Sequence, residues 1–180
     1  MQHKIICIDP GLGGTGFAIF SGNKQDLLPE RTGVLHSTTK ATQTNWSLRQ
    51  SEILARLIEV IEEVPLIENN ISVDVYIELP NFFRQKKGMT CATGKDGGDS
   101  DLVKLAVMVG RLQETFLVFT KCTKIVLVPV SWKGQLTKYA VENRIRQRIG
   151  CKKWEYGDHA TDAVGIGLFV KGVFKANATR

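Results

Sequence analysis

Hydrophobic and polar positions follow two different spacings along the chain. Short runs rich in β-branched residues, bounded by glycine, proline or polar residues, predict strands at 4–11, 14–22, 31–39, 73–80 and 124–130. A glycine-rich turn separates the first two runs, so we expect them to pair as a hairpin. The last run, KIVLVPV, is almost entirely apolar and predicts an interior strand.

Apolar residues recur at helical spacing in most of the chain between these runs. Leucine and isoleucine recur at i, i+3, i+4 and i+7 from Leu54 to Ile61, which predicts an amphipathic helix over 47–64. Residues 81–101 have no apolar period and several glycines, and they predict a long loop. We expect three further helices: an apolar and well-buried one at 101–119, a basic one at 131–149, and a final one at 159–171.

The order of these elements predicts an α/β fold. The chain has three predicted strands, then a helix, and then strands and helices in alternation. This order indicates one mixed sheet flanked by helices. The 180 residues contain no internal repeat and no obvious boundary, so we expect a single domain over 1–180. Hydrophobic residues make up 43% of the chain and charged residues 23%, which is a globular composition.

Composition also narrows the classes of function. No apolar run reaches the roughly 18 residues that a membrane span needs, and the N-terminus lacks the pattern of a signal peptide, so we expect an intracellular protein. Four scattered cysteines without a CxxC pair disfavour a zinc ribbon or a redox dithiol. A net charge of +6 favours an anionic partner, with nucleic acid as the first candidate.

Acidic residues stand near the ends of two predicted strands and in the last helix. Asp9 closes the first strand, Glu78 lies near the end of the fourth, and Asp162 lies in the first turn of the final helix. Ligands of open α/β sheets gather at such strand ends, and converging carboxylates are a usual way to hold Mg²⁺ or Mn²⁺. Taken singly, each acid is more often a turn former or a helix cap. Their combination in a basic chain favours a metal site.

Three segments together resemble the RuvC family of Holliday junction resolvases, within the RNase H-like superfamily. The segments are IICIDPGLGGTGFAIF, VYIELPNFF and DHATDAVGIGLF. The family has a first strand carrying Asp-Pro-Gly, a glutamate ending its fourth strand, and a final helix that begins with His or Asp, two residues, and Asp-Ala. The resemblance implies an RNase H-like (RuvC-type) α/β fold, with a mixed five-stranded sheet flanked by helices on both faces. The matching residues are Asp9, Glu78, His159 and Asp162.

The resemblance implies a function and a set of roles. RuvC-like proteins are homodimers that bind four-way DNA junctions and nick two opposed strands symmetrically, using Mg²⁺ or Mn²⁺. By resemblance, Asp9, Glu78 and Asp162 would be ligands of two metal ions, and His159 a ligand or a group that moves a proton. His159 could instead cap the helix, and Asp158, one residue out of register, would be a cap or a supporting acid.

Basic and aromatic residues are the candidates for DNA contact. Family members carry lysines after the fifth strand that contact the scissile phosphate, and here Lys133 and Lys138 match them. Arg144 belongs to the same basic segment, for which the ordinary alternative is a solvated face. An aromatic wedge follows the glutamate in the family. The candidates are Phe82 or Phe83, with Arg84, Lys86 and Lys87 beside them, and the alternative is that these rings pack into the core.

Several alternatives stay open at this stage. The same carboxylates would serve a broader branched-DNA or flap nuclease or an RNase H, and residues 85–101 match no RuvC pattern. A non-catalytic junction-binding protein is disfavoured because every metal position is filled, and an actin-like ATPase needs a far longer chain. We expect the protein to act in the cytoplasm or nucleoid, wherever host DNA is replicated. The apolar helices 47–64 and 101–119 could supply the homodimer interface.

Overall fold

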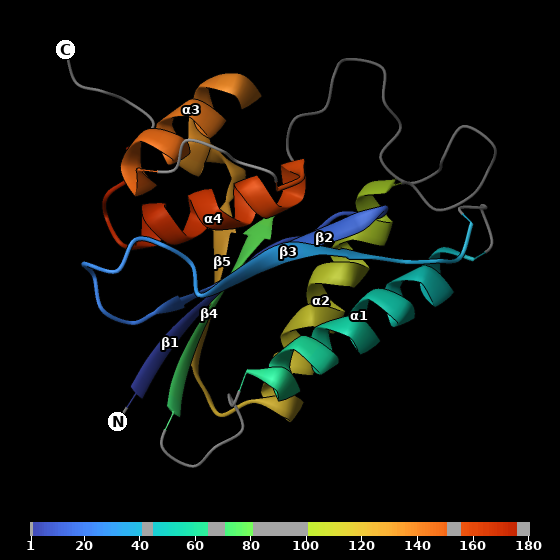
Figure 1. Ribbon diagram of the computed structural model, residues 1–180. Coiled ribbons are helices and arrows are strands. Elements are labelled where there is room, and N and C mark those ends of the chain that lie inside the picture. The colour runs from blue at the N-terminus through green and yellow to red at the C-terminus, as the bar shows by residue number, and fades with distance from the viewer. Residues whose placement is uncertain (1, 41–44, 65–70, 81–100, 151–155, 176–180) are drawn as a thin grey trace.

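The computed structural model describes residues 2–40, 45–64, 71–80, 101–150 and 156–175. Figure 1 shows the arrangement of the helices and strands. In chain order the elements are β1 (Gln2–Asp9), β2 (Gly14–Ser21), β3 (Arg31–His36), α1 (Trp46–Glu63), β4 (Ile71–Leu79), α2 (Asp101–Phe119), β5 (Cys122–Pro129), the short 3₁₀ helix η1 (Val130–Lys133), α3 (Lys138–Ile149) and α4 (Asp158–Val170).

The strands form one mixed five-stranded sheet, as predicted, and their order in it is β3-β2-β1-β4-β5. The three N-terminal strands are antiparallel neighbours, whereas β4 pairs parallel with β1 and β5 pairs parallel with β4. Ile8 of β1 lies opposite Ile77 of β4, so the next residues, Asp9 and Glu78, leave the sheet at the same edge. This register brings together two acids that are far apart in the sequence.

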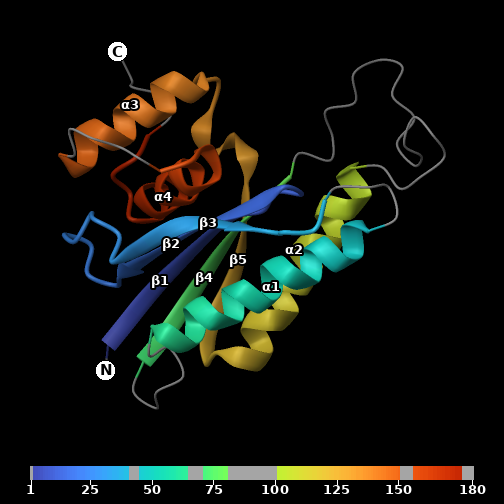
Figure 2. The ribbon, with the colours of Figure 1, turned by 45° about the vertical axis from the view of Figure 1, so that its right-hand side comes forward.

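Helices cover both faces of the sheet, which confirms the predicted layering. Helices α1 and α2 lie on one face, and α4 lies on the other with α3 packed outside it (Figures 1 and 2). Successive β1 residues point to opposite faces, so Ile6 and Ile8 join the α1 and α2 core while Cys7 joins the α4 core. Strands buried on both sides explain the continuous apolar runs of the sequence.

Small residues let α4 lie close to the sheet and to η1. A Cβ atom at Gly16 of β2 would overlap the backbone carbonyl of His159 at the start of α4. A Cβ atom at Gly167 would overlap the ring of Phe20, and one at Gly165 would overlap the ring of Trp132. The first turn of α4 is therefore held directly over the end of β1.

The prediction of one basic helix over 131–149 is wrong for the first third of that range. Residues Val130–Lys133 form η1, and α3 begins only at Lys138. Gly134 ends η1 with a positive φ of 60°, and the Thr137 hydroxyl accepts a hydrogen bond from the backbone N–H of Ala140 to cap α3. The break lets the chain turn, and it places Lys133 in the 3₁₀ helix η1 rather than in the α-helix α3.

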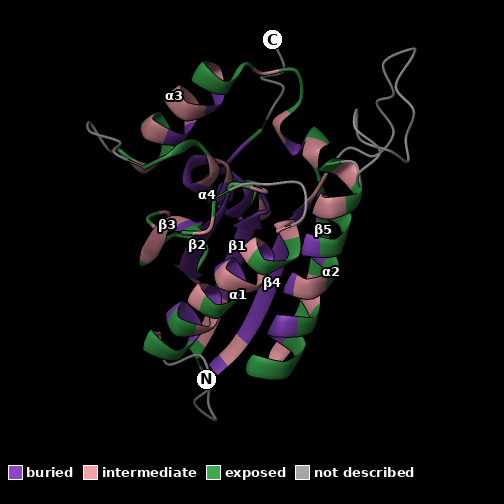
Figure 3. Ribbon diagram, turned by 90° about the vertical axis from the view of Figure 1, so that its right-hand side faces the viewer, coloured by how far each residue is buried: buried purple, intermediate pink, exposed green. Residues whose placement is uncertain are grey.

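The burial predicted for β5 and α2 is also wrong. Strand β5 is an edge strand of the sheet, and Val126 and Leu127 are partly exposed. Helix α2 buries residues such as Met108, Leu112 and Phe116, but Leu117 and Val118 are 67% and 69% exposed. Figure 3 shows this exposed side of α2. An apolar pattern cannot distinguish a core-facing surface from one that is left for a partner. None of the helices in the described ranges is long and apolar enough to cross a membrane.

Candidate active site at the carboxyl edge of the sheet

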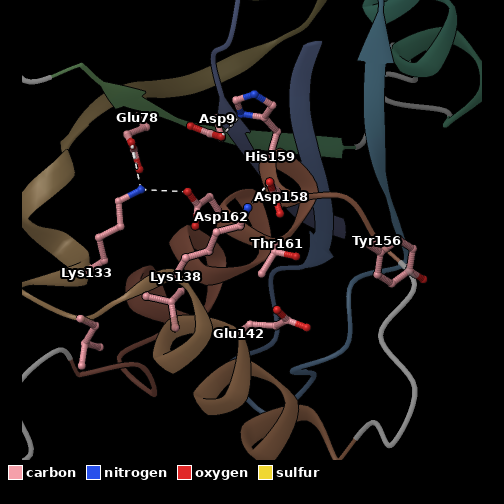
Figure 4. Close-up of a pocket in the computed structure, with 12 residues that line it drawn as sticks. Asp9, Glu78, Lys133, Lys138, Glu142, Tyr156, Asp158, His159, Thr161 and Asp162 are labelled. Carbon is pink, nitrogen blue, oxygen red and sulfur yellow. Dashed lines mark hydrogen bonds and ion pairs between the residues drawn. The ribbon is translucent and has the colours of Figure 1, made fainter. Parts of the chain in front are cut away.

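A pocket of about 490 Å³ opens where β1, β4, η1 and the start of α4 meet. Figure 4 shows its ionisable side chains, which come from elements distant in the sequence. The structure brings together six of the residues predicted to be catalytic or metal-binding: Asp9, Glu78, Lys133, Lys138, His159 and Asp162. The pocket therefore unites the acids of the strand ends with the two predicted lysines.

Asp9 and His159 form a hydrogen-bonded pair on one side of the pocket. His159 donates through Nδ1 to Asp9 Oδ2 at 2.5 Å, and Asp9 itself is buried. Burial raises the pKa of Asp9 above its ordinary value, although the hydrogen bond with His159 opposes that rise. The same hydrogen bond raises the pKa of His159, against the effect of its partial burial. The hydrogen bond thus favours the charged form of each partner, whereas burial opposes the charged form of both.

The ring of His159 rests over the glycine-rich turn after β1. A Cβ atom at Gly11 would collide with the imidazole of His159, just as one at Gly16 would collide with its carbonyl. Gly11 and Gly16 thus make room for the histidine of α4. The expectation that His159 or Asp158 caps the helix is wrong, because Gly157 is the N-cap and both side chains contact other groups.

Glu78 is buried at the end of β4 and has two donors. The indole N–H of Trp132 donates to Glu78 Oε2 at 2.6 Å, and Lys133 Nζ lies 3.4 Å from Oε1. Burial, and next the negative charge of Asp9, raise the pKa of Glu78 to about 7, while the two donors lower it. Glu78 therefore exchanges its proton near neutral pH.

Asp162 and Lys133 form the third side of the carboxylate cluster. Lys133 Nζ lies 2.8 Å from Asp162 Oδ2, so one ammonium group bridges Asp162 and Glu78. Burial alone would lower the pKa of Lys133, but the negative charges of Glu78 and Asp162 raise it above its ordinary value. The lysine is therefore a charged, half-buried counter-ion between two acids.

The remaining predicted residues lie farther from this cluster or outside the described ranges. Lys138 forms an ion pair with Asp158 at the rim of the pocket. Arg144 lies on α3, where its Nη1 donates to the carbonyl of Lys175 at 2.8 Å, and it does not line the pocket. The proposed wedge and its basic neighbours lie outside the described residues: Phe82, Phe83, Arg84, Lys86 and Lys87.

Trp132 is a residue of the candidate site that the sequence did not reveal. It is 2% exposed, donates to Glu78, and packs against Gly165 of α4. It thus links the strand that carries Glu78 to the helix that carries Asp162. Its only sequence signal is its place beside Lys133 in VSWKG, since a buried tryptophan is ordinarily a core residue.

The donor set fits a hard divalent cation, although the side chains are arranged around Lys133. Carboxylate oxygens are the preferred ligands of Mg²⁺ and suit Mn²⁺, and the site already holds a cationic group between two of them. Within the described ranges, no group of three His, Cys, Asp or Glu side chains is arranged to hold a metal ion. Binding of a divalent cation by Glu78 and Asp162 would therefore require their arrangement with Lys133 to change.

The topology and the acids at this edge of the sheet define an RNase H-like fold. Comparison with solved structures places it more narrowly, since it matches "T. thermophilus RuvC in complex with Holliday junction substrate" with a TM-score of 0.65 and 18% identity over 92% of this chain and 91% of that chain. A second match, "Thermus thermophilus RuvC structure", has a TM-score of 0.63 and 17% identity over 92% of each chain. No family model and no curated protein matches the sequence. The fold is thus of the RuvC type, as predicted.

Proposed function

We propose that the chain is a divalent-metal-dependent, structure-selective DNA endonuclease that resolves four-way junctions by paired symmetric nicks. The observation that carries the proposal is the meeting of Asp9, Glu78 and Asp162 with Lys133 in one pocket of a RuvC-type sheet. One of the matched RuvC structures is a complex with a Holliday junction substrate, and a net charge of +6 suits a DNA partner.

The proposed chemistry divides between bound ions and side chains. Two Mg²⁺ or Mn²⁺ ions per site would supply a water of lowered pKa and a counter-charge for the leaving oxygen. Asp9, Glu78 and Asp162 would hold the ions, because their oxygens line the pocket. His159, fixed through Nδ1 by Asp9, presents Nε2 as a further ligand or as the atom that exchanges a proton.

The lysines and the segment after β4 are the proposed DNA contacts. Lys133 and Lys138 line the pocket and would neutralise the charge of the scissile phosphate and its neighbour. We retain Arg144 as a phosphate contact outside the pocket. The residues that follow β4 are retained as the proposed wedge and its basic neighbours: Phe82, Phe83, Arg84, Lys86 and Lys87.

Cleavage of a labelled four-way junction in Mg²⁺ or Mn²⁺ tests the proposal. We expect Asp9→Asn and Asp162→Asn to reduce cleavage to background, because each substitution removes an anionic ligand. Asp26→Asn is the matched control, since Asp26 is exposed and lies outside the pocket, and we expect it to cleave as wild type does. Wild-type cleavage by Asp9→Asn would contradict the assignment.

Comparison of substrates separates the junction resolvase from related nucleases. A four-way junction, a flap and an RNA–DNA hybrid are tested side by side with the wild-type protein. We expect the junction to be preferred, with paired nicks at symmetric positions in opposed strands. Equal cleavage of the flap would indicate a general branched-DNA nuclease, and preference for the hybrid would indicate an RNase H.

We further propose that the protein acts as a homodimer through the exposed face of α2. Val103, Val107, Leu117 and Val118 recur at helical spacing and are all at least partly exposed. Gly110 lies within the same row, and a Cβ atom there would meet nothing within 4 Å. The row also contains the exposed Glu114, and its apolar side chains around a small residue suit a self-complementary contact between two copies.

A further inference from the structure

Lys133 occupies a position inside the carboxylate cluster rather than beside it. Its Nζ lies 2.8 Å from Asp162 Oδ2 and 3.4 Å from Glu78 Oε1, and its side chain is mostly buried. Figure 4 shows the ammonium group between these two carboxylates. The group therefore takes the place in which a cation shared by Glu78 and Asp162 would lie.

The backbone that carries Lys133 is fixed on both sides. The preceding residue, Trp132, is buried against Gly165 of α4 and is hydrogen-bonded to Glu78. The following residue, Gly134, donates its backbone N–H to the carbonyl of Ser131 at 2.9 Å and closes η1. The side chain of Lys133 thus starts from a rigid base, and only rotation of the side chain itself can move Nζ away.

We propose that Lys133 is an internal competitor of the metal, so that a divalent ion binds Glu78 and Asp162 only as the ammonium group withdraws. This inference rests on the proposed function, since it concerns the same site. A metal ion shared by the two carboxylates needs oxygens at about 2.0–2.6 Å. An ammonium group and a divalent ion cannot both lie between the same oxygens, because of overlap and of the repulsion between like charges.

The second lysine of the pocket provides the contrast. Lys138 Nζ pairs with Asp158 at the rim, and both side chains are largely exposed. It lies against neither Glu78 nor Asp162 in any ion pair of the described residues. Removing Lys138 deletes the same charge from the same pocket without freeing a metal ligand, so it separates competition for the ligands from a general effect of charge.

The competition also has a consequence for the metal-free protein. The carboxylates of Asp9, Glu78 and Asp162 lie in one pocket and repel one another unless a cation lies among them. Lys133 supplies that cation before metal binds. Loss of its charge should therefore destabilise the metal-free protein, and bound metal should restore the lost stability.

Titration of Mn²⁺ into the DNA-free protein, followed by calorimetry, tests the inference. We expect Lys133→Met and Lys133→Gln to bind Mn²⁺ about tenfold more tightly than wild type, which corresponds to about 1.4 kcal/mol. We expect Lys138→Met to change the affinity by about twofold at most, because its ion pair is exposed. The melting temperature in EDTA should be lower for Lys133→Met than for wild type. Addition of Mn²⁺ should raise the melting temperature of Lys133→Met by more than it raises that of wild type.

The outcomes distinguish this inference from the proposed function. Unchanged or weaker Mn²⁺ binding by both Lys133 variants, with clear binding by wild type, would overturn the competition and leave the metal site standing. An equal gain in Lys138→Met would overturn it as well, because the gain would then be a general effect of charge. No Mn²⁺ binding by any of the proteins would overturn both the inference and the metal-dependent nuclease.

Discussion

Trp132 controls a single carboxylate through one hydrogen bond. Its indole N–H donates to Glu78 at 2.6 Å, inside a site whose burial raises the pKa of Glu78 to about 7. The donated hydrogen bond lowers that pKa, because it stabilises the charged form of the carboxyl group. The tryptophan therefore favours the carboxylate form of Glu78, which is the form that the proposed metal site needs.

Trp132→Phe removes the donor and keeps an aromatic ring in the same place. Without the donor the pKa of Glu78 should rise further, so fewer molecules carry the carboxylate at a given pH. We expect Mn²⁺ affinity to fall by about 10- to 100-fold near pH 6.5, with a smaller loss at pH 8, where a larger share of Glu78 is deprotonated in both proteins. Calorimetric titration over this pH range measures the effect.

Phe174→Leu is the matched control for Trp132→Phe. Phe174 packs edge-on against Trp132 with ring centroids 5.2 Å apart, so its truncation disturbs the packing but not the hydrogen bond. The control should melt at a lower temperature while its pH dependence of Mn²⁺ binding stays that of wild type. A Trp132→Phe protein whose pH dependence also matches wild type would show that the tryptophan only packs.

Individual site residues differ in how far the sequence reveals them. The acids and His159 were predictable because they recur in motifs with local spacing, and Lys133 because it follows the fifth strand. Trp132 was not, because its hydrogen bond to Glu78 joins residues 54 positions apart. Arg144 shows the converse, since a basic residue in a basic segment contacts the backbone of Lys175 rather than the pocket.

At the scale of elements, the close contact between β2 and α4 determines where His159 and Asp162 lie. A Cβ atom at Gly16 would overlap the backbone carbonyl of His159, which cannot move without moving the helix. We expect Gly16→Ala to shift the start of α4, to destabilise the protein by about 1–3 kcal/mol, and to impair junction cleavage. Denaturant unfolding and the cleavage assay measure the two effects.

Gly13→Ala tests whether any substitution in the glycine-rich turn has the same effect. A Cβ atom at Gly13 would meet only the guanidinium of Arg49, at 3.9 Å, so there is room for a methyl group. We expect this variant to have the same free energy of unfolding and the same junction-cleavage activity as wild type. Equal losses from both substitutions would mean that the flexibility of the turn matters, rather than the approach of α4.

Two predictions of secondary-structure elements were wrong, and each has a physical reason. Helix 131–149 was predicted as one piece because its side chains suit a helix throughout, whereas Gly134 and Thr137 divide it through a positive φ and a cap. Strand β5 was predicted to be interior because it is apolar, but its place at the edge depends on the order of strands. Strand order is set by tertiary packing, which local pattern does not record.

At the scale of the whole molecule, the exposed apolar face of α2 bears on assembly. A row that includes Val107, Leu117 and Val118 is exposed on this face and forms the proposed dimer contact. We expect Leu117→Glu to dissociate the dimer, because a buried and unpaired carboxylate would be costly at its interface. Sedimentation measures this change as a lower apparent mass, with junction resolution lost and circular dichroism unchanged.

Leu28→Glu is the control for the dimer prediction. Leu28 is 60% exposed in the connection between β2 and β3, away from α2. Its substitution adds the same charge to an exposed leucine, and the apparent mass should not change. A wild-type protein that sediments as a monomer at all concentrations would contradict the proposed homodimer.

The three acids of the site come from three distant segments of the chain, and this determines when the site can form during synthesis. Asp9, Glu78 and Asp162 meet only after β1, β4 and α4 have all reached their places. During synthesis β1 and β4 can pair before α4 has left the ribosome, since chains fold as they emerge. The growing chain then carries only two of the three acids of the proposed metal site. The proposed nuclease activity would therefore wait for the docking of the last helix, and a partly made chain would not nick DNA.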